Sequence, residues 1–207
     1  DFEVSEGVLN TGGYTIEVGF FKLLGSATVN LSSSNIYLYR SATVSSPNFN
    51  AETSSIFLRT NNGLVANNAW NTYTSHVNNL IIESGLRIHI RANGGSFNKI
   101  EHRGTGVPVL YDNITADSII INPGKTLELD GTVTVNDYLE MNGTCSLLSN
   151  LTGTGTLSSA TGNIVVNHTN IENITATGGA SFVANNSYDL GGNSGWTINS
   201  TSAKDYY

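Results

Sequence analysis

Two acidic residues with alternate spacing are the first candidates for chemistry in this chain. Glu128 and Asp130 alternate with Leu127 and Leu129, so an extended strand here presents both acids on one side. Glycoside hydrolases use two such carboxyl groups around the bond that they cleave. Glu140 extends the set if the following strand stacks beside the first. The surrounding sequence lacks the dense aromatic and acidic groove of sugar-cleaving proteins. We therefore predict no catalytic residue, with a carbohydrate-active enzyme as the alternative.

Basic residues with the same alternation form a candidate binding surface. Arg87, His89 and Arg91 are separated by single apolar residues, so a strand presents all three on one face. Further basic residues follow about one repeat later: Lys99, His102 and Arg103. A basic surface of this kind favours an anionic glycan or an acidic protein partner. The alternative is a solvated face that is balanced by the nearby acids Glu83 and Glu101.

The least regular stretch, residues 64–79, carries aromatic residues between Asn-rich turns. Trp70 and Tyr73 lie in it, and an aromatic side chain on a loop is a suitable contact for a ligand. The alternative is that Trp70 covers the side of the core, because Trp is largely buried in most proteins. The complete set of ligand-binding candidates is Arg87, His89, Arg91, Lys99, Trp70 and Tyr73.

Metal and cofactor sites are not expected. The 4 histidines show no metal-ligand spacing, and neither an EF-hand loop nor a phosphate-binding loop occurs. Asp189 precedes a Gly-Gly-Asn segment and offers oxygens to a calcium ion, but an Asp-stabilised turn explains the same residues. Cys145 is the single cysteine, so no internal disulfide forms. Its neighbours Leu147 and Leu148 predict a buried thiol that acts as a small hydrophobic group.

The composition restricts the partners. Only 12% of the 207 residues are charged, and the net charge of -7 disfavours the phosphate backbone of nucleic acids. No apolar run approaches the length of about 18 residues that a membrane helix needs, and the first residues lack the features of a signal peptide. We expect a soluble chain without nucleic acid or membrane insertion. The start at Asp1 without Met fits a processed product or a piece of a longer protein.

A loose repeat of strand-like segments organises the chain. Comparable segments recur about every 20 residues, at 79–82, 98–101, 118–121 and 138–141, and a second series lies at 85–90 and 124–129. A period near 20 made of strands and turns is typical of a β-solenoid, in which each coil lies on the last. We predict an all-β fold, a right-handed parallel β-helix of about 20 residues per coil, as a single domain over residues 1–207. An antiparallel β-sandwich is the alternative.

The open end of such a stack needs a cap. Residues 178–198 contain two glycine pairs and a lone Trp, and we predict that they form the last coil and its cap. The structural residues of this cap are Gly178, Gly179, Asp189 and Trp196. A regular array of Thr on a solenoid would indicate a further candidate function, which is binding to ice or another crystal surface. Thr152, Thr154 and Thr156 alternate, but this run does not recur in each coil, so we place that candidate last.

Several segments carry a resemblance to a known family. They are Leu31–Leu38, Ile121–Leu127, Ala176–Phe182 and Asp189–Trp196. Together they resemble a broad β-helix family found among secreted and surface proteins of Bacteroidetes and virion or tail proteins of bacteriophages. The resemblance implies a non-enzymatic structural or adhesion protein at a virion or bacterial cell surface. It also implies partners that are other structural subunits, including further copies of the chain, or a host-surface glycan.

Overall fold

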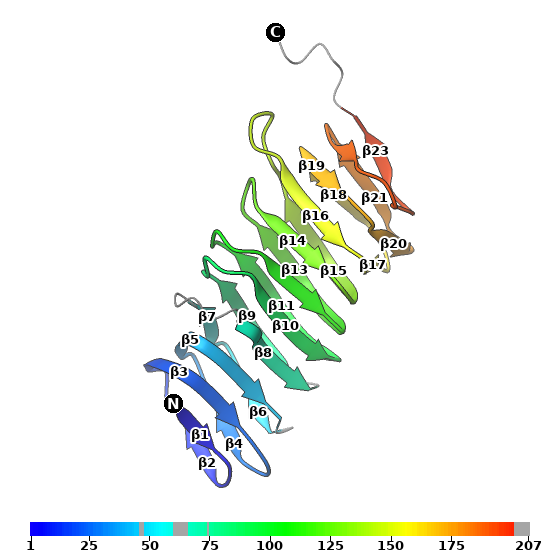
Figure 1. Ribbon diagram of the computed structural model, residues 1–207. Coiled ribbons are helices and arrows are strands. Elements are labelled where there is room, and N and C mark those ends of the chain that lie inside the picture. The colour runs from blue at the N-terminus through cyan, green and yellow to red at the C-terminus, as the bar shows by residue number, and fades with distance from the viewer. Residues whose placement is uncertain (46–47, 60–65, 74, 201–207) are drawn as a thin grey trace.

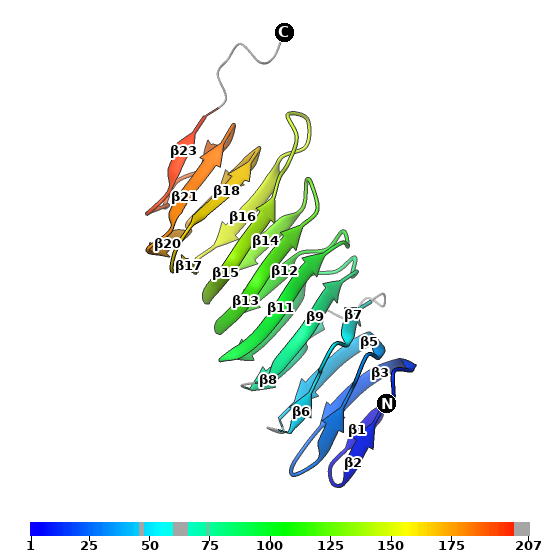
Figure 2. The same ribbon diagram turned by 180° about the vertical axis from the view of Figure 1, so that it is seen from behind.

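The computed structural model describes residues 1–45, 48–59, 66–73 and 75–200, with the backbone alone for 66–73 and 93. The chain is an all-β solenoid of about 8 turns, spaced by about 20 residues. Figures 1 and 2 show the strands stacked along one long axis, with the amino-terminal coil at one end and the carboxyl-terminal coil at the other. No helix in the described part of the chain is long and apolar enough to cross a membrane.

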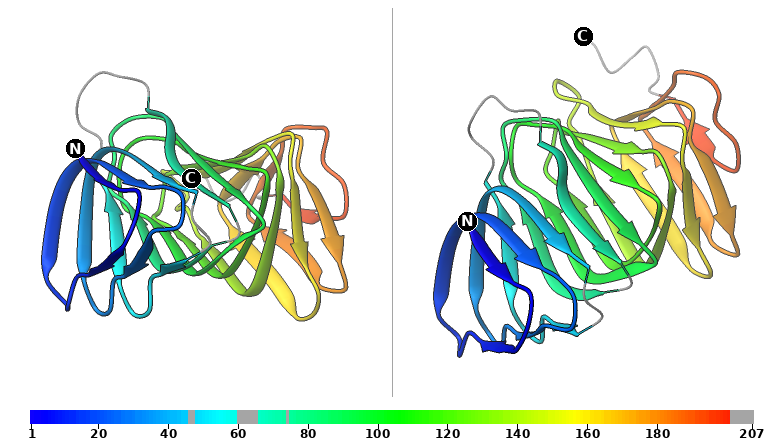
Figure 3. Two further views of the ribbon diagram at one scale, coloured as in Figure 1. Left: turned by 90° about the horizontal axis from the view of Figure 1, so that it is seen from below. Right: turned by 60° about the horizontal axis from the view of Figure 1, so that its bottom comes forward.

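Each coil contributes to up to three ladders of strands, which we call faces A, B and C. Face A contains β1 (Phe2–Val4), the second halves of β3 (Thr15–Leu23) and β5 (Asn35–Val44), β8 (Ala66–Tyr73), β10 (Ile88–Asn93), β12 (Pro108–Tyr111), β14 (Thr126–Leu129), β16 (Ser149–Gly153), β19 (Thr169–Ile171) and β22 (Tyr188–Asp189). Figure 3 shows the coils stacked one upon another when the molecule is seen from below.

Face B contains β2 (Val8–Asn10), β4 (Thr28–Asn30), β6 (Phe49–Asn50), the first parts of β9 (His76–Ile82), β11 (Gly95–His102), β13 (Asn113–Ile121) and β15 (Thr132–Met141), then β17 (Thr156–Ser159) and β20 (Thr175–Gly178). Face C contains the first halves of β3 and β5, β7 (Ser55–Leu58) and the second parts of β9, β11, β13 and β15. A separate parallel sheet of β18 (Asn163–Asn167), β21 (Ser181–Asn185) and β23 (Thr197–Asn199) follows.

The long strands serve two faces because they turn a corner in the middle. In β11, Phe97 and Ile100 are both buried while Asn98 and Lys99 between them are not, so the alternation of the pleat is interrupted there. The corresponding register shift in β13 and β15 lies between Ala116 and Ser118. Side chains before and after the corner therefore face in different directions, which decides how the candidate site residues are grouped.

The core is built from straight stacks of apolar side chains, one residue from each coil. One stack on face C contains Ile36, Ile56, Leu80, Ile100, Ile119 and Leu139, all of them buried. The register of its last four members confirms the repeat read from the sequence. Every strand pairing that joins the described coils is parallel, which excludes the antiparallel sandwich.

Neutral amide side chains also join neighbouring coils. Five pairs donate from the Nδ2 of one Asn to the Oδ1 of another at 2.7–2.9 Å, namely Asn30 to Asn10, Asn98 to Asn78, Asn167 to Asn142, Asn170 to Asn150 and Asn199 to Asn185. Parallel stacking places like residues next to each other, and the two-sided amide is suited to this because it donates and accepts. The abundance of Asn in a chain with few charges therefore has a structural role.

Candidate functional site on faces A and C

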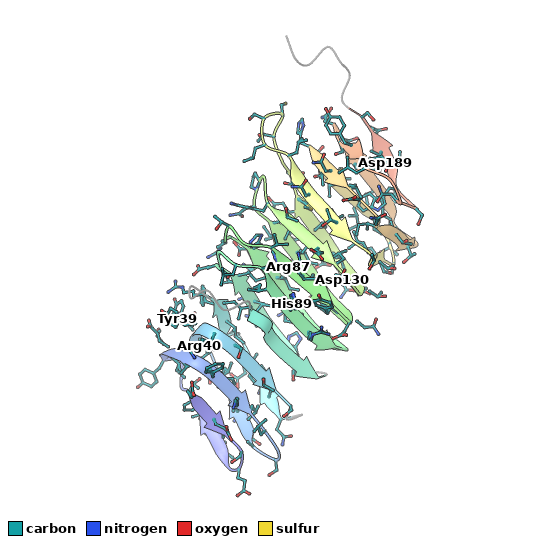
Figure 4. All side chains as sticks on the ribbon, in the orientation of Figure 1. Tyr39, Arg40, Arg87, His89, Asp130 and Asp189 are labelled. Atoms are coloured by element: carbon teal, nitrogen blue, oxygen red, sulfur yellow. The ribbon has the colours of Figure 1, made fainter. Side chains whose placement is uncertain are left out.

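Two predicted basic residues of β10 and Arg87, which directly precedes this strand, lie together on the outside of face A. The inward residues Ile88 and Ile90 are fully buried, so the pleat directs Arg87, His89 and Arg91 outward. In Figure 4, Arg87 and His89 lie close to Asp130, near the middle of the stack. The sequence interpretation of a shared face is therefore confirmed for these three residues, and Glu128 of β14 and Asp130, which follows this strand, lie beside them.

An ion pair across two coils holds the first of these side chains. Arg87 donates from Nη2 to the Oε1 of Glu128. Val109 lies between the two coils and pairs in register with both His89 and Glu128. Val109 has no exposed surface although its pleat position is opposite to that of the inward residue Leu110. The polar side chains around it must therefore cover it, which gives Arg87 and Glu128 a role in packing.

Tyr111 contacts the other two of these basic residues, Arg91 and His89. The guanidinium carbon of Arg91 lies 4.2 Å from the centre of the Tyr111 ring, and the His89 ring meets the same ring edge-on with centroids 4.9 Å apart. Burial and then the carboxylate of Asp130 raise the pKa of Tyr111. Burial, followed by the charges of Arg87 and Arg91, lowers the pKa of His89, so this imidazole is neutral at neutral pH.

Lys99 lies on a different face from these residues. It follows the corner of β11 and projects from face C, where its Nζ is 2.9 Å from Oε2 of Glu101. Arg103 binds the same carboxylate, with Nε 2.5 Å from Oε1. The hydrogen bond from Arg103 is the main cause that lowers the pKa of Glu101. A single basic surface from Arg87 to Lys99 is therefore not present, and the basic groups of face C are balanced by an acid.

The face C network continues over three earlier coils. Arg59 donates from Nε to Oε2 of Glu83 at 2.6 Å, and Glu83 lies 4.0 Å from Arg103. The same guanidinium lies over the Tyr37 ring at 4.1 Å, and Tyr37 stacks on Phe57 with centroids 4.5 Å apart. A chain of aromatic and charged contacts thus connects four successive coils on the outside. The sequence alternative of a face balanced by Glu83 and Glu101 is therefore confirmed here, but Arg59 and its aromatic partners were missed because they come from separate repeats.

His102 does not belong to the basic surface, which corrects the sequence interpretation. The pleat that directs Lys99, Glu101 and Arg103 outward directs His102 inward, where it pairs with Ile82 and Ile121 in a core stack. It is completely buried, and both ring nitrogens lack a hydrogen-bond partner. Burial is the main cause that lowers its pKa to about 4, and the charge of Lys125 acts in the same direction.

The structure corrects two other sequence expectations, for Cys145 and Glu140, and a third concerns side chains that it does not describe. Cys145 is exposed and not buried, because it lies in a turn closed by backbone hydrogen bonds between Thr144 and Leu147 outside the core. Glu140 pairs with Ile120 on face C, so it does not join Glu128 and Asp130. The backbone of β8 lies beside β10, with Trp70 opposite Ile90 and Tyr73 opposite Asn93, but the side chains of Trp70 and Tyr73 fall outside the described residues.

The predicted cap residues form a turn and lie close to the coil beneath them. Asp189 accepts hydrogen bonds from the Gly191 amide at 2.9 Å and from Nδ2 of Asn193 at 2.6 Å, so its oxygens are used in a turn. A Cβ on Gly178 would lie 2.0 Å from the Ser159 oxygen, and one on Gly179 would lie 2.2 Å from the Ala160 oxygen. Figure 4 places Asp189 at the carboxyl-terminal end of the stack.

We expect Trp196→Ala to loosen the carboxyl-terminal coils. Trp196 is half-buried and packs edge-on against Phe182, with ring centroids 5.5 Å apart. Loss of these contacts costs about 2 kcal/mol, less than for a fully buried Trp. Hydrogen exchange over residues 163–199 measures the effect, and Tyr14→Ala at the opposite, exposed end is the control. Unchanged exchange, melting and protease resistance would count against a capping role.

Among the described residues, no group of three or more His, Cys, Asp or Glu side chains is arranged to hold a metal ion. The polar groups of faces A and C are mainly bound to one another, so their chemistry is that of ion pairs and cation–π contacts.

Comparison with known proteins found no matching family model, no matching curated protein and no matching solved structure.

Proposed function

We propose that this chain is a non-enzymatic structural and adhesion module of an extracellular assembly, at the surface of a virion or of a bacterial cell. The observation that supports the proposal is that charged residues on the outside of faces A and C form ion pairs with one another. Arg87 with Glu128 on face A, and Arg59 with Glu83 on face C, connect different coils. Individual exposed ion pairs contribute little, but a connected set with aromatic partners favours a rigid outer surface.

The resemblance of the closing segment to virion and bacterial surface β-helices supports the extracellular location. The partners that fit this role are other structural subunits, including copies of the chain, and a glycan on a host surface. Face A offers such a glycan the Tyr111 ring with the Arg91 guanidinium and the neutral His89 imidazole beside it. A carbohydrate-active enzyme is the second candidate, because Glu128 and Asp130 flank the inward residue Leu129 on this face.

Two measurements on the intact chain separate the adhesive role from the purely structural one. Binding to surface polysaccharides on a glycan array, without release of soluble sugar, supports adhesion. Ordered oligomers in electron micrographs, without glycan binding, support a purely structural role. A monomeric chain that neither binds glycans nor assembles contradicts the proposal.

A further inference from the structure

Face B carries a regular array of hydroxyl groups that the reading of Thr152–Thr156 did not reveal. Four successive strands, β13, β15, β17 and β20, each present two outward residues separated by one inward residue. In register, these pairs are Asn113 with Thr115, Thr132 with Thr134, Thr156 with Ser158, and Thr175 with Thr177. We call these eight residues the threonine array. Thr152 pairs with Glu128 on face A, so only Thr156 of the run noted in the sequence belongs to the array.

The array differs from faces A and C in charge and in hydrogen bonding. All eight members are exposed or half-exposed, and none carries a charge. Within the described part of the chain, Thr175 accepts a hydrogen bond from Ser194 at 3.2 Å, and the other six hydroxyl groups have no partner in the protein. These hydroxyl groups are therefore available to a ligand, whereas the polar groups of the other outer faces are mainly occupied by one another.

The parallel register of the strands aligns the array in two rows. Neighbouring coils are about 4.8 Å apart, and alternate residues of a strand are about 6.6 Å apart, so the hydroxyl groups form a two-dimensional lattice. The inward residues between the two rows, Ile114, Val133, Leu157 and Ala176, are all buried in the core. Because Thr is branched at Cβ, its side chain has few rotamers. Little conformational freedom is lost when such a surface binds.

Glycines form the corner beside one row of the array. A Cβ on Gly131 would lie 2.0 Å from the oxygen of Asp112, and one on Gly155 would lie 2.5 Å from the oxygen of Gly131. Side chains larger than hydrogen do not fit between these coils without a shift of the backbone. The corner therefore keeps successive coils close together and in line where they enter face B.

A repeating lattice of uncharged hydroxyl and methyl groups matches a ligand that is itself periodic. We propose that the threonine array binds the surface of ice. Hydroxyl groups in two regular rows can each hold a water molecule, and a layer of water ordered in this way can be shared with the ice lattice. A crystalline polysaccharide has similar hydroxyl chemistry, but its flat sugar rings favour aromatic side chains, which the array lacks. This site is separate from the group of Arg87, Glu128, His89, Arg91 and Tyr111 on face A, and it does not depend on the function proposed above.

The test is partitioning of the purified chain into a slowly growing ice surface, together with the change that the chain causes in ice-crystal growth. The wild-type chain is expected to enter the ice and to slow growth. Thr134→Tyr, in the middle of the array, is expected to reduce partitioning to the level of an unrelated protein. Thr105→Tyr, at an exposed residue on a turn outside the array, is the matched control and keeps the wild-type behaviour. Circular dichroism and melting verify that both variants fold.

A second variant decides the matter independently of any loss of folding. Asn113→Thr with Ser158→Thr gives every position of the array a threonine, and this double variant is expected to enter ice more completely than the wild type. Three results would overturn the proposal: a wild-type chain excluded from ice, whether or not microcrystalline cellulose retains it, a folded Thr134→Tyr variant that partitions normally, or a folded double variant that enters ice no better than the wild type.

Discussion

Acidification from about pH 7 to about pH 4 is expected to lower the free energy of unfolding by about 3 kcal/mol through His102 alone. Burial lowers the pKa of this imidazole from 6.5 to about 4 in the folded chain. Between these two values the unfolded chain binds a proton that the folded chain does not. Stability therefore falls as the pH falls through this window, and it does not depend on this group above it.

His102→Leu separates this effect from those of other titrating groups. Leu is apolar and close in size to Ile82 and Ile121, which flank His102 in the stack. Glu101, whose pKa is lowered by Arg103, remains in the variant and also loses stabilisation at low pH. Chemical unfolding at a series of pH values is expected to show a smaller slope between pH 6.5 and about 4 for His102→Leu. Equal slopes for the two chains would refute the role of His102.

Gly106→Ala is expected to destabilise the stack by about 3 kcal/mol, at the upper part of the range for overpacked interiors. Its φ is not in the left-handed region, so the effect is steric. A Cβ here would lie 1.9 Å from the oxygen of Leu86 and 2.5 Å from its carbonyl carbon. Both are backbone atoms of the preceding coil, and they can retreat only if the parallel ladder opens. Chemical unfolding measures the loss.

Gly85→Ala is the matched control for this prediction. Gly85 lies in the corresponding turn of the preceding coil, and a Cβ there would meet only the Thr105 hydroxyl, at 3.4 Å. We expect a change within about 1 kcal/mol, because Ala also restricts the unfolded chain. Similar unfolding midpoints for Gly106→Ala and Gly85→Ala would mean that the coils are less closely packed than the structure describes.

The solenoid was predictable because its signal is local and repeated. Strands at 79–82, 98–101, 118–121 and 138–141 recur with nearly constant spacing, and their register in face C follows that spacing. The segment Pro108–Tyr111, which forms β12, was missed because its run of buried residues, Pro108 to Leu110, does not alternate. The irregular aromatic stretch with Trp70 and Tyr73, two coils earlier, also lacks a clear alternation in its sequence.

Which side chains share a face depends on where the long strands turn a corner, and the sequence does not show these positions. Lys99 and His102 were assigned to the same surface as Arg87, but the interrupted alternation at Asn98 and Lys99 moves one residue to face C and the other into the core. The threonine array was hidden for a related reason. A turn that carries Cys145 lengthens one coil, so the interval between Thr134 and Ser158 differs from that between Thr115 and Thr134.

The central claim is that the acids of face A hold the coils together and do not cleave sugar. Release of soluble sugar from a panel of surface polysaccharides tests it most directly, with the intact chain measured beside Glu128→Gln and Asp130→Asn. Since Glu128 is bound to Arg87, we expect release at the level of a blank for all three chains. Release by the wild-type chain that either substitution abolishes would contradict the account and identify an enzyme.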